Sequence, residues 1–163
     1  MNMKQEIIRI VEQMKDTIGE NALRGLFDSG DRATGEKRVG CNQFREIASD
    51  CRYADCYEEI VLLVRYTQAK SKRGESWKKV CANREPFGEV VVDGMNRVKG
   101  LCGTEDWEKI REPLQLFFGY LYWQSRIWSD QYAQQNGGNP GVNHAGNTQG
   151  NQHNQNHGNN RRQ

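Results

Sequence analysis

The first 143 residues of this sequence contain no histidine, because His144, His153 and His157 all lie in its last stretch. Most of the chain therefore lacks the commonest general base and the histidine of a Ser–His or Cys–His nucleophile pair. The five cysteines form no C-x-x-C pair, which argues against a zinc site. We therefore expect a protein that is not an enzyme and that holds no metal and no cofactor.

Long apolar runs are missing as well. The most apolar stretch, Pro113–Tyr132, is interrupted by Gln and Arg, whereas a membrane span needs about 20 apolar residues. The chain starts MNMKQEIIRI, which alternates charged and aliphatic residues rather than forming a signal peptide. The odd number of cysteines, set within periodic apolar patterns, is typical of a reducing compartment. We expect a cytoplasmic protein that makes no contact with a membrane.

The net charge of the chain is also small. The formal charge is +2, and it comes from Arg161 and Arg162, so residues 1–134 are neutral. Overall charge therefore indicates no class of partner, and an anionic partner has to be argued from local clustering.

What the sequence does contain is helical periodicity. Apolar residues recur at spacings of three and four over residues 3–18, 21–27, 41–51, 57–70, 87–102 and 104–132. Thr104 is a candidate N-cap, and we expect Pro113 to start or kink the last helix. The pattern predicts an all-α fold, a compact bundle of five or six helices in a domain over residues 1–134.

The last 29 residues, 135–163, differ in composition from the rest. They consist almost entirely of Asn, Gly, Gln and His. Such a segment cannot bury enough apolar area to offset its chain entropy, so we expect a disordered tail.

The helix after Pro113 has two apolar faces. One stripe is broad and predicts a core face: Leu114, Phe117, Phe118, Leu121, Ser125, Trp128 and Tyr132. A helix with a second apolar stripe is either central in a bundle or buries that stripe on another chain. We expect a subunit interface at Leu116, Tyr120, Trp123 and Ile127.

Positive charge is concentrated in one segment. Residues 65–84 carry +6, with one acid, Glu75, whereas residues 41–64 and 85–113 each sum to −3. Cations with interleaved aromatic rings suit an RNA backbone and its bases. The candidate phosphate contacts are Arg65, Lys70, Lys72, Arg73, Lys78, Lys79 and Arg84, and the candidate stacking groups are Tyr66 and Trp77. A charged loop without a ligand, stabilised by the dipole of the preceding helix, is equally consistent with this pattern.

The order of these features resembles a known family. The segments LLVRYTQAK, FGEVVVDGMNRVKG and FFGYLYWQSRIW, with the basic connector after the first, resemble the small helical subunit of type III CRISPR effector complexes, the III-A kind most closely. The resemblance covers about Cys41 to Tyr132, and Tyr66, Ala69 and Lys70 stand where that family tends to have a tyrosine, a small residue and a basic one. The long Asn/Gly tail departs from the family.

This resemblance implies a non-catalytic subunit with a role in antiviral defence. It implies several copies stacked head to tail beside other subunits of the effector complex, lining the groove that holds the crRNA and its target RNA. Two other hypotheses remain open. One is a helical adaptor or regulatory protein that binds only protein through the second stripe, and the other is an enzyme that uses cysteine or carboxylates.

Overall fold

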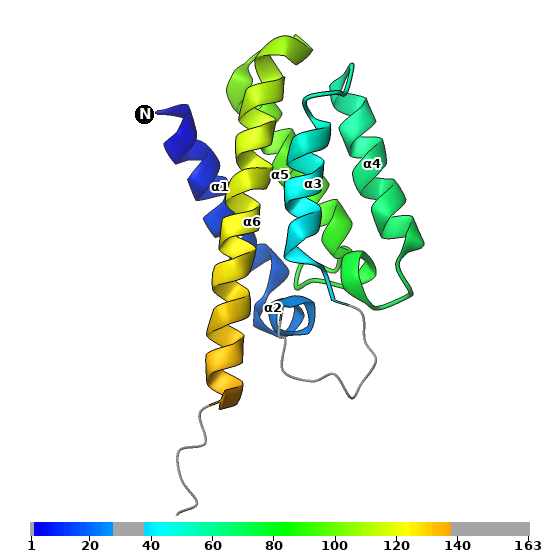
Figure 1. The fold of residues 1–163 in the computed structure, drawn as a ribbon, viewed down its shortest axis with the longest axis vertical. Coiled ribbons are helices and arrows are strands. Elements are labelled where there is room, and N and C mark those ends of the chain that lie inside the picture. The colour runs from blue at the N-terminus through cyan, green and yellow to red at the C-terminus, as the bar shows by residue number, and fades with distance from the viewer. Residues whose placement is uncertain (1, 28–37, 138–163) are drawn as a thin grey trace, which may run out of the picture.

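The computed structural model describes residues 2–27 and 38–137, without the side chains of residues 136 and 137. This part of the chain contains six α-helices and no β-sheet, which confirms the predicted all-α class. The helices are α1 (Met3–Ile18), α2 (Glu20–Phe27), α3 (Cys41–Asp50), α4 (Tyr57–Lys70), α5 (Phe87–Cys102) and α6 (Trp107–Gly137), with a 3-10 turn, η1 (Ser76–Lys78), before α5 (Figure 1). Residues 28–37 and the greater part of the predicted disordered tail, from residue 138, lie outside the described residues.

Helix α6 runs along the whole bundle and packs against α1, α2, α3 and α5 (Figure 1). The predicted core stripe is confirmed, because all seven of its residues, from Leu114 to Tyr132, are at most 4% exposed. The one polar member, Ser125, donates its hydroxyl proton to the carbonyl of Tyr122 at 2.8 Å. A buried hydroxyl in a hydrogen bond avoids the cost of an unsatisfied polar group.

The sequence left open whether Pro113 starts or kinks the last helix. Pro113 does not start a helix, since α6 begins at Trp107 and continues through the proline. Asp106 rather than Thr104 caps the helix, and its Oδ1 accepts from the backbone N–H of Glu108 at 3.2 Å. The buried indole of Trp107 donates to the carbonyl of Ala54 at 2.8 Å and so anchors the first turn.

Helix α5 approaches α6 closely at a glycine. A Cβ atom at Gly94 would lie 2.8 Å from Cζ of Phe117, closer than side-chain atoms pack. The aromatic ring therefore occupies space that any larger residue at position 94 would need. Gly100, in the same helix, has no neighbouring atom within 4 Å of the same position.

Candidate nucleic-acid interface

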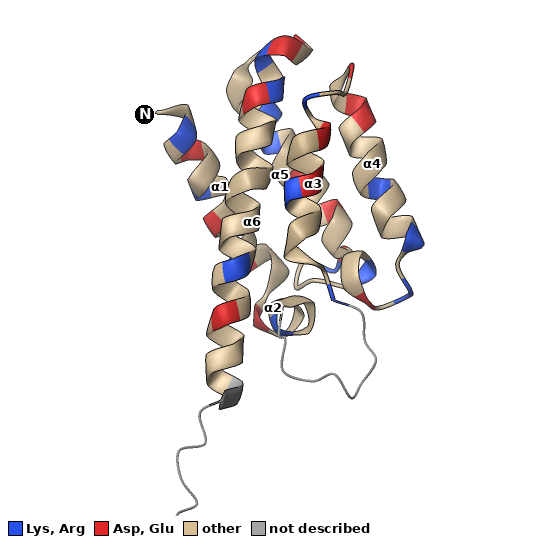
Figure 2. Cartoon of the chain, viewed as in Figure 1, with Lys and Arg blue, Asp and Glu red and all other residues tan. Residues whose placement is uncertain are grey.

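Helix α4 carries the first cations of the predicted basic segment. Its buried face consists of Tyr57, Ile60 and Val64, which leaves Arg65, Tyr66 and Lys70 exposed. Acidic residues occupy its first turn and Lys70 its last, the arrangement that the helix dipole favours. Figure 2 shows the positive charge along the lower part of α4 and on the loop below it, with acids at the upper end of the helix.

The connector between α4 and α5 is held in place by backbone hydrogen bonds. The N–H of Cys81 donates to the carbonyl of Glu85, and the N–H of Arg84 to the carbonyl of Cys81, both at 2.9 Å. The N–H of Ala82 donates to the carbonyl of Ile18, the last residue of α1, at 2.9 Å. The cations of this connector therefore project from a fixed backbone.

Two residues of the connector other than glycine have positive φ angles, Ser76 at 50° and Arg84 at 67°. A side chain other than that of glycine costs about 1 kcal/mol in this left-handed region. Arg84 is exposed, and its side chain has no ion-pair partner among the described residues.

Trp77 is not a stacking group, so this part of the prediction is wrong. Its side chain is 1% exposed and packs between Phe44 and Phe87, with ring centroids 5.6 and 5.3 Å away. Its indole Nε1 donates to Oε1 of Gln43 at 2.8 Å. Burying this large aromatic ring stabilises the fold, whereas leaving it exposed in the polar connector would not.

Three of the seven predicted phosphate contacts have a side-chain ion pair, hydrogen bond or cation–π contact among the described residues. Arg65 forms an ion pair with Glu89, with Nε 3.3 Å from the carboxylate. Lys78 donates to the carbonyl of Ala69 at 3.1 Å, at the C-terminal end of α4. Lys70 lies over the ring of Tyr66, with Nζ 4.7 Å from the centroid. Of these three interactions, the ion pair of Arg65 alone neutralises a charge.

The other cations are distributed over two sides of the connector. Lys72 and Arg73 are exposed in the turn after α4. The side chain of Lys79 instead lies across Gly25 of α2, and the turn that carries Arg84 packs on the end of α1. Apart from Arg65, none of the seven lies within ion-pair distance of an acid in residues 2–27 or 38–137.

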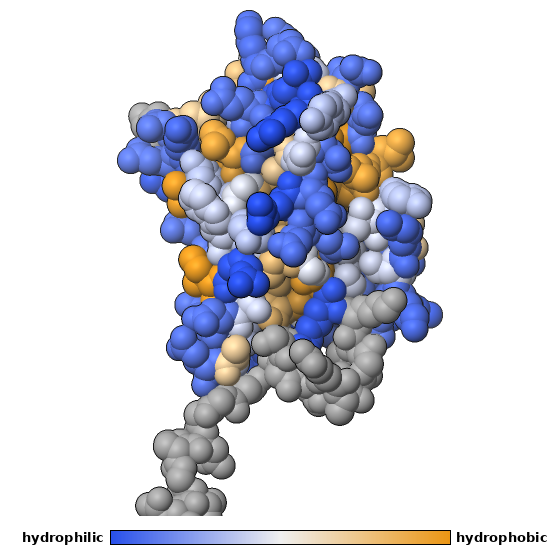
Figure 3. Space-filling model, viewed as in Figure 1, coloured by the Kyte–Doolittle hydropathy of each residue, from blue (hydrophilic) through white to orange (hydrophobic). Residues whose placement is uncertain are grey.

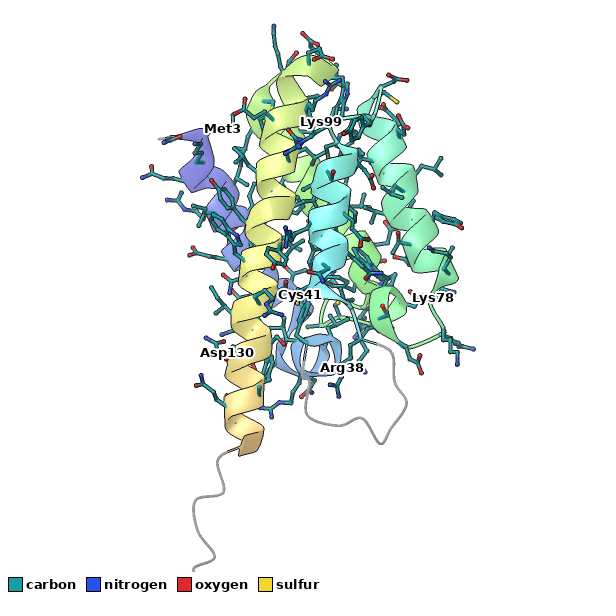
Figure 4. All side chains as sticks on the ribbon, in the orientation of Figure 1. Met3, Arg38, Cys41, Lys78, Lys99 and Asp130 are labelled. Atoms are coloured by element: carbon teal, nitrogen blue, oxygen red, sulfur yellow. The ribbon has the colours of Figure 1, made fainter. Side chains whose placement is uncertain are left out.

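We define the basic surface as the cations at the lower end of α4: Arg38, Lys70, Lys72, Arg73 and Lys78. Arg38 was not predicted, because it precedes Arg65 by 27 positions and has no helical register with it. The structure places Arg38 with Lys70 and Lys72 around one hollow. Figure 4 shows Arg38, Cys41 and Lys78 in the lower half of the bundle, whereas Lys99 lies near its upper end.

Glu75 is the single acid of residues 65–84 and is half buried. Its Oε2 atom is buried and has no hydrogen-bond partner among the described residues. This carboxylate lowers the local positive potential and forms no ion pair within residues 2–27 and 38–137.

An aromatic groove that the sequence did not predict lies beside the basic surface. It has a volume of about 570 Å³ and runs between the end of α3 and the outer side of α4. Tyr53 and Tyr66, which line it, are 81% and 58% exposed, and Leu62 also lines the groove. Apolar residues are visible over the upper part of α4 in Figure 3. Tyr66, a predicted stacking group, is therefore accessible to a ligand.

The second stripe of α6 is divided between two environments. Leu116 and Tyr120 are half buried against the core, whereas Trp123 and Ile127 are 62% and 50% exposed. The rings of Tyr120 and Trp123 contact each other, with centroids 5.6 Å apart. An accessible apolar face remains at Trp123 and Ile127.

The described residues contain no group of three or more His, Cys, Asp and Glu that could hold a metal ion. All five cysteines are free. Burial, with a smaller effect of Asp50, raises the pKa of Cys51 to about 12, and burial raises the pKa of Cys81 to about 12. A thiolate is the reactive form of cysteine, so these two thiols are poor nucleophiles at neutral pH.

No helix in the described part of the chain is long and apolar enough to cross a membrane. Comparisons with protein-family models, with curated proteins and with solved structures found no match for this chain.

Proposed function

We propose that this protein is a non-enzymatic RNA-binding subunit of an RNA-guided effector complex in the cytoplasm, the role implied by its resemblance to the small subunit of type III CRISPR complexes. In this role it contacts the backbone of the crRNA or of its target RNA, and base pairing supplies the sequence specificity. The observation that carries the proposal is the basic surface. Four of its cations, Lys70, Lys72, Arg73 and Lys78, have no acid within ion-pair distance among the described residues.

The charge balance supports an anionic partner. A neutral domain has no general attraction for RNA, so a local excess of cations is needed to release counterions from phosphates. The residues before and after the basic segment carry compensating negative charge, yet only Arg65 of the seven predicted contacts pairs with an acid in the described part of the chain. The exposed ring of Tyr66 lies beside Lys70 and offers a stacking platform next to the phosphate contacts.

Neutralisation of Lys70, Lys72 and Arg73 to glutamine tests the proposal. RNA binding should weaken evenly across sequences, and the log–log slope of affinity against salt should flatten by about 0.7 for each single-strand phosphate that is no longer neutralised. Fluorescence anisotropy with short single-stranded RNAs over a salt series measures both quantities.

A matched control removes the same charge elsewhere. Lys4, Lys15 and Arg126 are exposed on α1 and α6 and belong to no ion pair among the described residues. Their triple glutamine variant should keep most of the affinity. Equal decreases of RNA affinity in the two triple variants, or no decrease in either, would rule out the basic surface as the RNA-binding site.

A protein-binding adaptor is the second candidate, because Trp123 and Ile127 leave an apolar face accessible. Trp123→Glu should disrupt assembly under both functions, since the proposed subunit also contacts its neighbours and further copies of itself. Nuclease-sensitive RNA that co-purifies with the protein supports the first function. An assembly that forms without RNA and survives the neutralisation of the basic surface supports the adaptor.

A further inference from the structure

Two surfaces of this chain expose large apolar side chains to solvent. The first is the aromatic groove of about 570 Å³ on the outer side of α4, where Tyr53, Leu62 and Tyr66 are 81%, 68% and 58% exposed. The second is the outer edge of α6, where Trp123 and Ile127 are 62% and 50% exposed. Figure 1 shows α3 between the two helices, so one chain cannot bring its own two surfaces together.

The two surfaces are complementary in shape. The groove is concave, and its lining includes Ile60, which is 1% exposed, so its floor is apolar. Its volume is in the range of pockets that take a molecule larger than one side chain. On α6 the large ring of Trp123 projects into solvent, and it contacts Tyr120 with centroids 5.6 Å apart. The edge of α6 therefore offers an aromatic knob that the groove has room to receive.

The groove also contains a negative charge that the fold does not use. Asp50, which lines it, is exposed and is the last residue of α3, where the helix dipole disfavours a carboxylate. Its side chain forms no ion pair among the described residues. Glu59, the other acid of the lining, accepts from the backbone N–H of Asp55 at 2.8 Å. Asp50 is thus the carboxylate that a cation entering the groove would meet.

The edge of α6 supplies such a cation. Arg126 is exposed beside Ile127 and belongs to no ion pair within the described ranges. The nearest acid along the helix, Asp130, accepts from Nε2 of Gln134 at 2.9 Å. We define the α6 edge as Trp123, Arg126 and Ile127, two apolar side chains with one cation.

We propose that the aromatic groove of one copy of this protein receives the α6 edge of a second copy, with Arg126 facing Asp50. A second copy fits because the same chain carries both complementary surfaces, and one contact removes both from water. The contact is head to tail, since each joined pair leaves one groove and one α6 edge free for further copies. Contact between copies is part of the proposed function, but this inference does not depend on RNA binding.

The test blocks each surface separately in nuclease-treated protein. Leu62→Glu blocks the groove and Trp123→Glu blocks the α6 edge, both at exposed positions, so both variants should keep the thermal stability of the unchanged protein. Analytical ultracentrifugation over a concentration series should show assemblies larger than a dimer for the unchanged protein and a monomer for each variant. Val80→Glu is the matched control, because Val80 is 58% exposed and lies in neither surface, and it should assemble normally.

An equimolar mixture of the two blocked variants gives the decisive measurement. It should form a dimer and nothing larger, because the intact groove of one variant receives the intact α6 edge of the other and no second contact is possible. Asp50→Arg and Arg126→Asp should each weaken association about two- to fivefold, the range for an exposed ion pair, and the two changes in one chain should restore it.

Three outcomes overturn the inference. The first is a monomer at every concentration up to about 1 mM, beyond which a contact is too weak to hold copies together. The second is assembly that persists in either blocked variant, and the third is a mixture that stays monomeric, since both would place the contact between copies elsewhere. The anisotropy test of the proposed function uses short RNAs that contact one copy, so neither its outcome nor its Arg126 control depends on this contact.

Discussion

Trp77 donates its indole N–H to Oε1 of Gln43 across 2.8 Å and so joins the basic connector to the first turn of α3. The ring also packs against Phe44 of α3 and Phe87 of α5. This residue belongs to the core even though both of its sequence neighbours are polar. Tyr66, the other aromatic residue of the segment, stays in solvent, and the two rings should therefore respond in opposite ways to substitution.

Trp77→Phe should lower the free energy of unfolding by about 1–3 kcal/mol, because the hydrogen bond to Gln43 is removed and the ring is smaller. Tyr66→Ala should leave stability within about 0.5 kcal/mol and should weaken RNA binding by about 1–3 kcal/mol, the range for a stacked base. Urea denaturation and anisotropy with hydroxyl-ended RNA measure the two effects. A decrease of RNA affinity in a fully folded Trp77→Phe protein would contradict the structural role.

Arg84→Gly should separate stability from binding. Glycine adopts the φ angle of 67° at this position without the steric cost of a Cβ atom, so the free energy of unfolding should stay the same or rise by up to about 1 kcal/mol. If Arg84 contacts phosphate, the same variant should bind RNA more weakly with a shallower salt dependence. Arg84→Lys retains the charge and is the control. Unchanged RNA binding in the glycine variant would remove Arg84 from the interface.

Gly94→Ala and Gly100→Ala should shift stability in opposite directions, although both lie in α5. At position 94 the new methyl group would meet the ring of Phe117 at 2.8 Å, and overpacking of this kind costs about 1–3 kcal/mol. At position 100 the space is open, so alanine should stabilise the helix by about 0.5–1 kcal/mol. Thermal and urea unfolding give the sign of each change. Stabilisation by Gly94→Ala would show that α5 and α6 are not packed as described.

The buried thiols predict a loss of stability at alkaline pH. Cys51 and Cys81 have folded-state pKa values of about 12, against an unfolded value of about 9. The unfolded chain therefore releases these protons first, and stability is complete below about pH 9 and falls as the pH rises toward 12. Each thiol should contribute up to about 1.4 kcal/mol per pH unit in this window.

Urea denaturation under reducing conditions at pH 8, 9 and 10 measures this slope. The double variant Cys51→Ala, Cys81→Ala is the control, because it lacks both thiols and should therefore lack their part of the slope. It should be less stable than the unchanged protein at every pH. Tyr57, whose pKa is also raised chiefly by burial, leaves a residual decline at higher pH. If stability fell equally steeply with pH in both proteins, the two thiols would ionise as readily in the folded protein as in the unfolded chain, which would contradict the prediction.

The helices and the core face of α6 followed from the sequence alone. The predicted segment 57–70 coincides with α4, and the stripe from Leu114 to Tyr132 is buried in full. Helical periodicity is a local property, since residues three and four positions apart share a face whatever the rest of the chain does. The basic segment was visible in the same way, because its charges are neighbours in sequence.

Tertiary structure decided which of those side chains reach solvent. Phe44 and Phe87 bury Trp77, and the carbonyl of Ala54 accepts from the indole of Trp107 in the first turn of α6. Arg38 joins Lys70 and Lys72 only because α3 packs beside α4. Periodicity places residues on the faces of one helix, but packing between distant segments determines which faces are covered, and no local pattern contains that information.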